Sequence, residues 1–273
     1  MIARVIILSI SIFLCSIVSL MGQENKKDWS DYPFSDGEIL TYVVYYNWGL
    51  LWVPAGEVKF TVTEKDSHIE LDVIGRSYSS YDNVFMVRDF YNSKVDKETM
   101  LPDDFRRDIL EGNYVRFDSI AFDQEEHTLV EYFGKTRETA KRHDFEVEKH
   151  VHDMVSVIYN LRTHNVKSMR DGDKVPVSIF FDKEPFNLDV LYRGMASKKI
   201  KNIGKVDVHH LQPQLIDGYV FSEGDVMDIW VSDDGNNIPL MIESPITIGS
   251  VKAILSGVGG LQHASSTLPA LKK

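Results

Sequence analysis

Hydrophobic and polar residues alternate along most of the chain. Val58, Phe60 and Val62 are separated by polar residues, and the same period of two returns at Ile69 and Leu71. Further segments with this period span residues 38–46, 114–122, 128–133, 174–181, 204–213, 225–232 and 238–244. Side chains of a strand point alternately to two faces, so the pattern predicts half-buried β-strands. In the stretch SDDGNN, residues 232–237, the Asp-Gly pair predicts a hairpin turn with positive φ angles.

One segment has the period of a helix instead. Between Met154 and Leu161, apolar residues recur three and four positions apart, which predicts one apolar face. Asp153 stands where a carboxylate accepts hydrogen bonds from the free amides of a first turn. Arg162 falls in the last turn, where the helix dipole favours a cation. We therefore expect a mainly β protein, a single antiparallel, strongly curved sheet or open barrel, with one packed α-helix at about residues 153–164.

The residues before this helix also suggest a metal site. His150 and His152 are two positions apart and Asp153 follows, and these are residue types that bind zinc or non-haem iron. An aspartate that caps a helix is not free to bind a metal, and the two histidines then lack an evident third ligand. We favour the cap over the metal site, expect no metal, and assign no role to either histidine.

The N-terminus has the pattern of a secretory signal peptide. Arg4 precedes an apolar run that small residues follow up to Gly22, which predicts cleavage of residues 1–22. An uncleaved membrane anchor needs about 20 apolar residues, and Leu14 before Cys15 disfavours lipid attachment at that cysteine. We expect an exported protein of the periplasm or outer-membrane periphery, with no transmembrane segment after cleavage.

Length and composition favour one domain. Residues 23–273 are long enough for a single β-rich domain, and we expect a flexible C-terminal tail from about residue 257. The hydrophobic fraction of 43% excludes global disorder. A formal net charge of −11 disfavours nucleic acid and anionic lipid surfaces, so we expect a neutral, apolar or cationic ligand. The single cysteine, Cys15, leaves with the signal peptide, so the core forms without disulfides.

Four short motifs, taken in their order along the chain, resemble those of a known protein family. They are GEILTYVVYYN at 37–47, DMVSVIYNLR at 153–162, WVSDDGNNIPL at 230–240 and IGSVKAIL at 248–255. Together they resemble an exported bacterial family known as domain of unknown function 3108. The resemblance implies an envelope protein, mostly antiparallel β, with no established activity and no catalytic residues. Asn237-Ile238 replaces the basic residue usual before the proline of the third motif, which puts a salt bridge at that turn in doubt.

A search for catalytic and cofactor motifs finds none. The sequence has no G-x-S-x-G elbow, no glycine-rich phosphate loop and no H-E-x-x-H motif. The neighbouring acids Asp103 and Asp104 point to opposite faces of a strand, as do His209 and His210. We assign no catalytic residue and expect no cofactor, although a triad built from distant strands leaves no local motif.

Aromatic residues give the functional hypothesis. The stretch YYNWGLLWVPAG, residues 45–56, places large apolar side chains in an expected turn, where they often mark a binding mouth. A second aromatic stretch, residues 77–91, is expected to wall the same cavity. The candidate ligand-binding residues are Trp48, Leu51, Trp52, Tyr78, Phe85 and Met86. The alternative for the first stretch is a turn folded back over the sheet, with both tryptophans in the core.

The function expected from these residues is that of a non-enzymatic periplasmic binding or carrier protein for a lipid or another apolar ligand. The alternative is a structural or interaction module of the cell envelope, which binds a protein partner and no small ligand. A continuous apolar cavity favours the first hypothesis, and a filled core favours the second.

Overall fold

The computed structural model describes residues 31–48, 51–215, 225–245, 249–265 and 267–268, without the side chain of Trp48. The chain divides into two units, residues 1–31 and residues 32–273. The expected signal peptide, residues 1–22, lies outside the described residues. The second unit contains every described strand.

Strands make up most of this unit. The N-terminal strands are β1 (Ile39–Trp48), β2 (Leu51–Glu64), β3 (His68–Ser77), β4 (Arg88–Asp96), β5 (Pro102–Glu111), β6 (Tyr114–Asp123), β7 (Thr128–Gly134) and β8 (Lys141–Glu146). The C-terminal strands are β9 (Lys174–Phe181), β10 (Glu184–Ile200), β11 (Gly204–Pro213), β12 (Asp228–Ser232), β13 (Pro239–Pro245) and β14 (Ser250–Gly259). The described helices are α2 (Ser156–Arg162) and the short 3-10 helices η2 (Arg137–Thr139) and η3 (Val166–Ser168). None of these helices has the length and apolar composition needed to cross a membrane.

The strands form one antiparallel sheet. Within the described residues it has fourteen strands in the order β8-β7-β6-β5-β4-β3-β2-β1-β14-β13-β12-β11-β10-β9. Strand β1 pairs with β2 on one side and with β14 on the other, so it joins two meanders. Strands β8 and β9 are the two edges and do not pair with each other, so the sheet stays open. The predicted mainly β, open antiparallel fold with one α-helix is confirmed.

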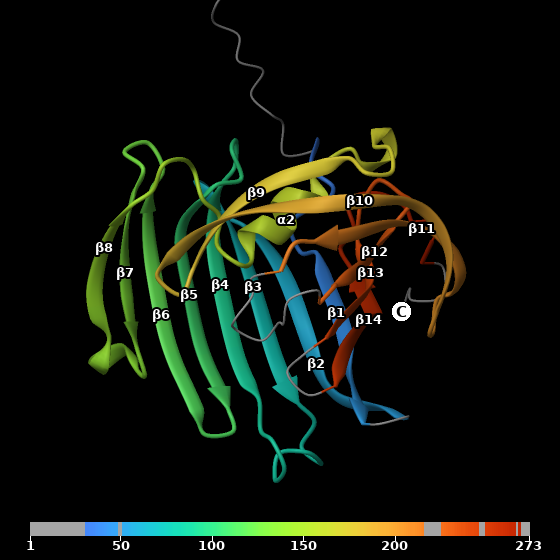
Figure 1. The fold of residues 1–273 in the computed structure, drawn as a ribbon, viewed down its shortest axis with the longest axis horizontal. Coiled ribbons are helices and arrows are strands. Elements are labelled where there is room, and N and C mark those ends of the chain that lie inside the picture. The colour runs from blue at the N-terminus through green and yellow to red at the C-terminus, as the bar shows by residue number, and fades with distance from the viewer. Residues whose placement is uncertain (1–30, 49–50, 216–224, 246–248, 266, 269–273) are drawn as a thin grey trace, which may run out of the picture. The chain divides into compact units, whose positions relative to one another are not determined.

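The sheet curves until its two halves meet on the inner face. Phe145 on edge strand β8 lies 5.0 Å from Phe180 on edge strand β9, measured between ring centroids. Arg107 on β5 forms an ion pair with Asp182 in the turn between β9 and β10. Figure 1 shows β9 and β10 crossing the concave side of the N-terminal meander, with α2 beside them. Side chains from both meanders therefore enclose a common interior.

Helix α2 lies in the connection between the two edge strands. It is shorter than predicted at both ends. Asp153 nevertheless caps its first turn, because its Oδ1 accepts the N–H groups of Val155 at 2.7 Å and Ser156 at 2.9 Å. The Ser93 hydroxyl of β4 donates to Oδ2 at 2.6 Å. The predicted cap is confirmed, and it also ties the helix to the inner face of the sheet.

The turn at residues 232–237 forms a hairpin, but its predicted backbone geometry is wrong. The positive φ angle falls on Asn237, at 47°, and not on the Asp-Gly pair. Gly235 is needed for space, because a Cβ atom there would lie 2.9 Å from the His263 ring. Packing of the C-terminal segment against this turn, which the local sequence does not reveal, determines where the glycine is required.

Residues from about 257, expected as a flexible tail, largely pack in their described part. Strand β14 continues to Gly259. Beyond it the Ser265 hydroxyl donates to Asp234 at 2.6 Å, and Leu268 is only 1% exposed. The segment covers one end of the main hydrophobic cluster, because Leu268 packs there with residues such as Leu240 and Leu255.

Candidate functional site

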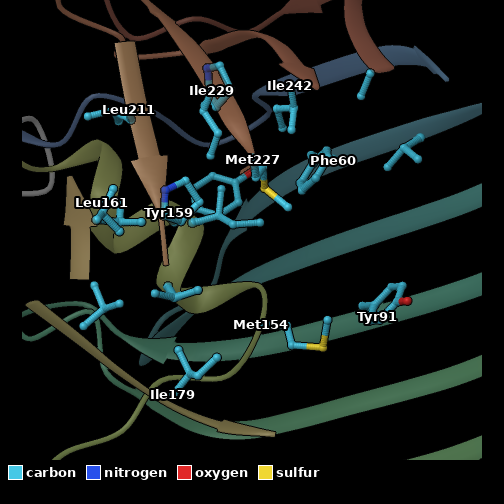
Figure 2. Close-up of a pocket in the computed structure, with 18 of the residues that line it drawn as sticks. Phe60, Tyr91, Met154, Tyr159, Leu161, Ile179, Leu211, Met227, Ile229 and Ile242 are labelled. Atoms are coloured by element: carbon cyan, nitrogen blue, oxygen red, sulfur yellow. The ribbon is translucent and has the colours of Figure 1, made fainter. Parts of the chain in front are cut away.

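The curved sheet and α2 enclose a cavity of about 920 Å³. Figure 2 shows its labelled lining residues around one space, with Tyr159 and Leu161 on the α2 side and Phe60 and Tyr91 on strands of the N-terminal meander. Leu211, Ile229 and Ile242 come from strands of the C-terminal meander. The cavity therefore depends on segments that are far apart in the sequence.

The N-terminal wall follows from strand alternation. Leu40 pairs with Phe60 and Tyr42 pairs with Val58 across β1 and β2, and all four line the cavity. The residues between them point to the other face, where Lys59 is exposed. Each strand thus contributes an apolar side chain at every second position, so a continuous apolar surface forms when the strands pair.

The C-terminal wall is built in the same way. Val177 on β9 pairs with Leu188 on β10, and Leu211 on β11 pairs with Ile229 on β12. All four side chains line the cavity. Because β9 is an edge strand, the wall ends at Val177 and its neighbours, and the β9–β10 turn closes the space against β5.

Helix α2 supplies a polar group to this apolar interior. Tyr159 is 1% exposed and its ring packs edge-on against Phe34, at 5.0 Å between ring centroids. Its hydroxyl has no hydrogen-bond partner among the described residues. Burial raises the pKa of this hydroxyl well above its ordinary value, so it stays protonated and remains a hydrogen-bond donor.

A buried ion pair closes the α2 end of the cavity. The Arg162 guanidinium donates to both carboxylate oxygens of Glu38, at 2.6 and 2.8 Å, and the two side chains are 3% and 0% exposed. It also donates to the main-chain oxygens of Asn236 and Pro33. Burial lowers the pKa of Arg162, but the Glu38 charge raises it overall, so the guanidinium stays charged. We name these residues the Arg162 site.

The Arg162 site brings the family-like motifs together. Glu38 belongs to the first motif, Arg162 to the second and Asn236 to the third. Asn237, next in the third motif, donates from its side chain to the main-chain oxygens of Arg162 and His164. The family resemblance implies a basic residue at this position, where this chain has Asn237-Ile238. Neutral hydrogen bonds from Asn237 therefore join the turn to the helix.

A second buried arginine lies on the other side of the cavity. The Nε atom of Arg107 donates to Asp118 at 3.0 Å, and its Nη2 atom pairs with Asp182 from the β9–β10 turn. The guanidinium also lies 4.9 Å from the centre of the Phe181 ring. Arg107 and Asp182 both line the cavity, so this ion pair joins the two halves of its wall.

An acid pair lies behind Arg107. The Glu131 side chain is 0% exposed, and its carboxyl group lies beside that of Asp118. Burial first, and the neighbouring Asp118 second, raise the pKa of Glu131 to about 8. At neutral pH Glu131 therefore keeps its proton, which it can donate to Asp118. We name Arg107, Asp118, Glu131 and Asp182 the Arg107 cluster.

The candidate ligand-binding residues lie apart from the cavity lining. Leu51, Trp52 and Phe85 are 70%, 36% and 54% exposed, so Trp52 is not a core residue. Tyr78 and Met86 are half-buried, and neither is a lining residue. Trp48 has its side chain outside the described residues. Of the second aromatic stretch, Tyr91 does line the cavity.

These candidates nevertheless gather at one end of the sheet. The start of β2 and the loop between β3 and β4 lie at the same end, which Figure 1 shows below the sheet. Phe85 packs against Gly112, and the main-chain N–H of Gly112 donates to Met86 at 2.7 Å. Gly112 follows Glu111, which lines the cavity, so this end borders the lined space. Whether the candidates bind a ligand stays a prediction.

The histidines before α2 have ordinary contacts. His152 is buried with its Nδ1 atom 3.3 Å from the Ser156 hydroxyl, and burial lowers its pKa to about 4. His150 packs against the ring of His127. Within the described ranges, no group of three or more His, Cys, Asp or Glu side chains is arranged to hold a metal ion.

The lining residues were missed because their signal is spread over the chain. A turn rich in aromatics stands out in a sequence, whereas the lining takes one to three residues from each of many strands and five from α2. The period of two at Val58 and Phe60 indicates a common face. Only the strand order shows that this face meets β9 and β12 across an interior.

The fold and the cavity define an open, β-barrel-like protein with an apolar interior. The family model DUF3108, a protein of unknown function, matches residues 41–256, and the chain belongs to this family. A β-barrel-like protein of domain of unknown function DUF1849 from Brucella abortus has a similar structure, with a TM-score of 0.57 and 9% identity. The match covers 83% of this chain and 98% of that chain, and it shows the fold alone. No curated protein matches the sequence.

Proposed function

We propose that this protein is a non-enzymatic binding or carrier protein, and that an apolar ligand occupies the cavity between α2 and the sheet. The observation that carries the proposal is the volume of about 920 Å³ together with its mostly apolar lining. Pockets for small ligands typically measure about 300–1,000 Å³ and have few polar groups. A lipid chain fits this description, and removing it from water supplies the binding energy.

The polar groups of the cavity support binding rather than catalysis. Arg107 and Arg162 are held by carboxylates on neighbouring elements, so both have structural partners. The hydroxyl of Tyr159 is a donor with an ordinary proton at neutral pH, since its pKa is raised. A donor of this kind orients a ligand but does not act as a base.

We further propose that the protein works outside the cytoplasm, in the periplasm or at the outer-membrane periphery. The support is the charge and apolar pattern of residues 1–22. N-terminal sequencing of protein recovered from its own cells is expected to find Gln23 or a neighbour as the first residue. Recovery of intact Met1, or of a chain beginning with a lipid-modified Cys15, would contradict this.

The binding proposal is tested by filling the cavity. Ile229 lines it, so Ile229→Trp should abolish the uptake of a fluorescent fatty acid, measured by titration. The matched control is Ile74→Trp, because Ile74 is 47% exposed and lies outside the lining. Both variants are checked for folding by circular dichroism. Equal loss of uptake in both, or no uptake by the parent protein, would contradict the proposal.

A second candidate function is an interaction module of the envelope without a small ligand. The exposed apolar side chains of Leu51, Val84 and Phe85 favour it, since such groups at one end of a sheet often contact a partner protein. Under this alternative, Leu51→Ser and Phe85→Ser would abolish binding to an envelope partner. Ile229→Trp would leave that binding unchanged.

A further inference from the structure

Three arginines line the cavity, and one of them differs from the others. Arg107 and Arg162 are buried and form ion pairs with carboxylates. Arg116, on β6, is half-buried, and no carboxylate among the described residues lies within ion-pair distance of it. Its charge is therefore available at the surface of an otherwise apolar space.

Arg116 is also held in a fixed position. Its Nε atom donates to the Tyr114 hydroxyl at 2.9 Å, and its guanidinium carbon lies 4.0 Å from the centre of the Phe133 ring. Stacking on a ring and a bond at Nε leave the Nη groups as donors, which is the fork that binds carboxylate or phosphate. Tyr114 lines the cavity as well.

A second cation lies over the Phe133 ring. The ammonium nitrogen of Lys183 lies 3.9 Å from the centre of the Phe133 ring. Lys183 belongs to the β9–β10 turn, where its φ angle of 74° directs the chain back toward β10. No carboxylate in the described ranges is within ion-pair distance of Lys183. Arg116 from β6 and Lys183 from the β9–β10 turn thus share one aromatic ring, and neither has an ion-pair partner among the described residues.

The acidic groups nearby already have partners or protons. Asp182 is paired with Arg107, and Glu131 keeps its proton at neutral pH. Burial first, and the charge of Glu111 second, raise the pKa of Asp89 to about 7, so Asp89 is only partly ionised at neutral pH. The negative net charge of the whole chain therefore does not cancel the local charge of Arg116 and Lys183.

We propose that Arg116 and Lys183 bind the anionic head group of an amphiphile whose apolar chain fills the cavity. This inference rests on the proposed function and adds the class of ligand: a carboxylate or phosphate head on an apolar chain. It differs from the neutral, apolar or cationic ligand that the net charge predicts. A head group bound to two cations beside an apolar cavity would also fix the direction in which the chain enters.

The experiment compares ligands with one chain and different heads. Dissociation constants for dodecanoate, dodecyl phosphate and dodecan-1-ol are measured at pH 7 by displacement of a fluorescent fatty acid. A charge-assisted hydrogen bond corresponds to about a tenfold or larger gain, so at least one anionic ligand should bind about ten times more tightly than the alcohol. The preferred anion distinguishes a carboxylate head from a phosphate head.

Variants then assign the preference to the two cations. Arg116→Gln with Lys183→Gln should remove the preference for the anions, so that the three ligands bind with similar dissociation constants. Arg116→Lys should keep part of the preference. The matched control is Arg142→Gln with Lys174→Gln, which removes the same charge from exposed residues paired with Asp144 and Asp189. The control should behave as the parent protein.

The outcomes separate the two proposals. If all three ligands bind equally to the parent protein, or if the control loses the preference as much as the test variant does, the head-group inference is overturned while cavity binding stands. If none of the three binds, the proposed function itself fails. Unfolding midpoints of all variants confirm that each is folded.

Discussion

The Arg162 site and the Arg107 cluster both place an arginine among carboxylates on the wall of one cavity, yet their charges balance differently. Arg162 faces a single carboxylate, Glu38, and two main-chain oxygens. Arg107 faces Asp118 and Asp182, with Glu131 behind them. In the Arg162 site one arginine faces one carboxylate, so no bound proton is needed to balance the charges. In the Arg107 cluster one arginine faces three carboxyl groups, so the cluster is destabilised unless Glu131 stays protonated.

This difference separates two kinds of structural role. At the Arg162 site every charge has a partner, so it joins the N-terminal segment, α2 and the β12–β13 turn at any moderate pH. The Arg107 cluster joins β5, β6 and the β9–β10 turn, but the strength of that junction varies with proton binding. The end of the cavity near the β9–β10 turn should therefore be the more sensitive to pH.

The largest expected effect on stability comes from breaking the ion pair of the Arg162 site. Arg162→Leu leaves the Glu38 carboxylate buried without its partner, which should lower the free energy of unfolding by about 3–5 kcal/mol. Urea denaturation monitored by tryptophan fluorescence measures the change. Arg142→Leu, which removes an exposed arginine, should leave the free energy of unfolding nearly unchanged. A loss below about 1 kcal/mol for Arg162→Leu would show that the site is not a structural junction.

A smaller effect is expected at the Arg107 cluster, and it depends on pH. The folded-state pKa of Glu131, about 8, lies above its unfolded value, so the folded state holds a proton that the unfolded state loses. Stability should therefore fall as pH rises from about 4.5 to 8, because the unfolded state loses this proton before the folded state does. Glu131→Gln, which resembles the protonated acid, should remove this contribution and raise stability at pH 8 by about 1–3 kcal/mol.

The comparison between parent protein and variant at pH 5 and pH 8 isolates Glu131. Asp89, whose pKa is also raised, contributes equally to both proteins and cancels. If the difference between Glu131→Gln and the parent protein is the same at the two pH values, Glu131 does not hold a proton in the folded state.

The smallest of these effects is expected at the cap of α2, which supports the Arg162 site from the opposite end of the helix. Asp153→Ala removes the acceptor of two main-chain amides and of the Ser93 hydroxyl, and should cost about 0.5–2 kcal/mol. Asp153→Asn should cost much less, because its amide supplies both an acceptor and a donor. Equal losses in the two variants, measured by thermal unfolding, would rule out a capping role.

Local features of this fold could be predicted from the sequence. The alternation at Val58 and Phe60 identified a strand with one buried face, and Asp153 identified the start of a helix. Both depend on residues within a few positions of each other. The role of Arg162 at the end of the helix was harder to predict. The sequence indicates a cation that the helix dipole favours, whereas the guanidinium binds Glu38, 124 positions away.

The cavity required information that the sequence does not contain locally. Its walls meet only because β1 pairs with β14 and because the β9–β10 turn reaches β5 and β7. Trp52 and Phe85 were candidates because they are aromatic residues in or near expected turns. Whether a side chain lines the cavity depends instead on the register of pairing across the whole sheet. The unpaired charge of Arg116 is likewise visible only when the positions of the surrounding carboxylates are known.

Native mass spectrometry tests most directly whether the cavity holds an amphiphilic ligand with an apolar chain. Protein purified from its own cells without detergent should carry a bound species with the mass of a lipid or fatty acid, and Ile229→Trp purified in parallel should lack it. Ile74→Trp should retain it. The account would be contradicted if the parent protein were detected only at the mass of the chain without a ligand, and if Ile229→Trp gave the same result.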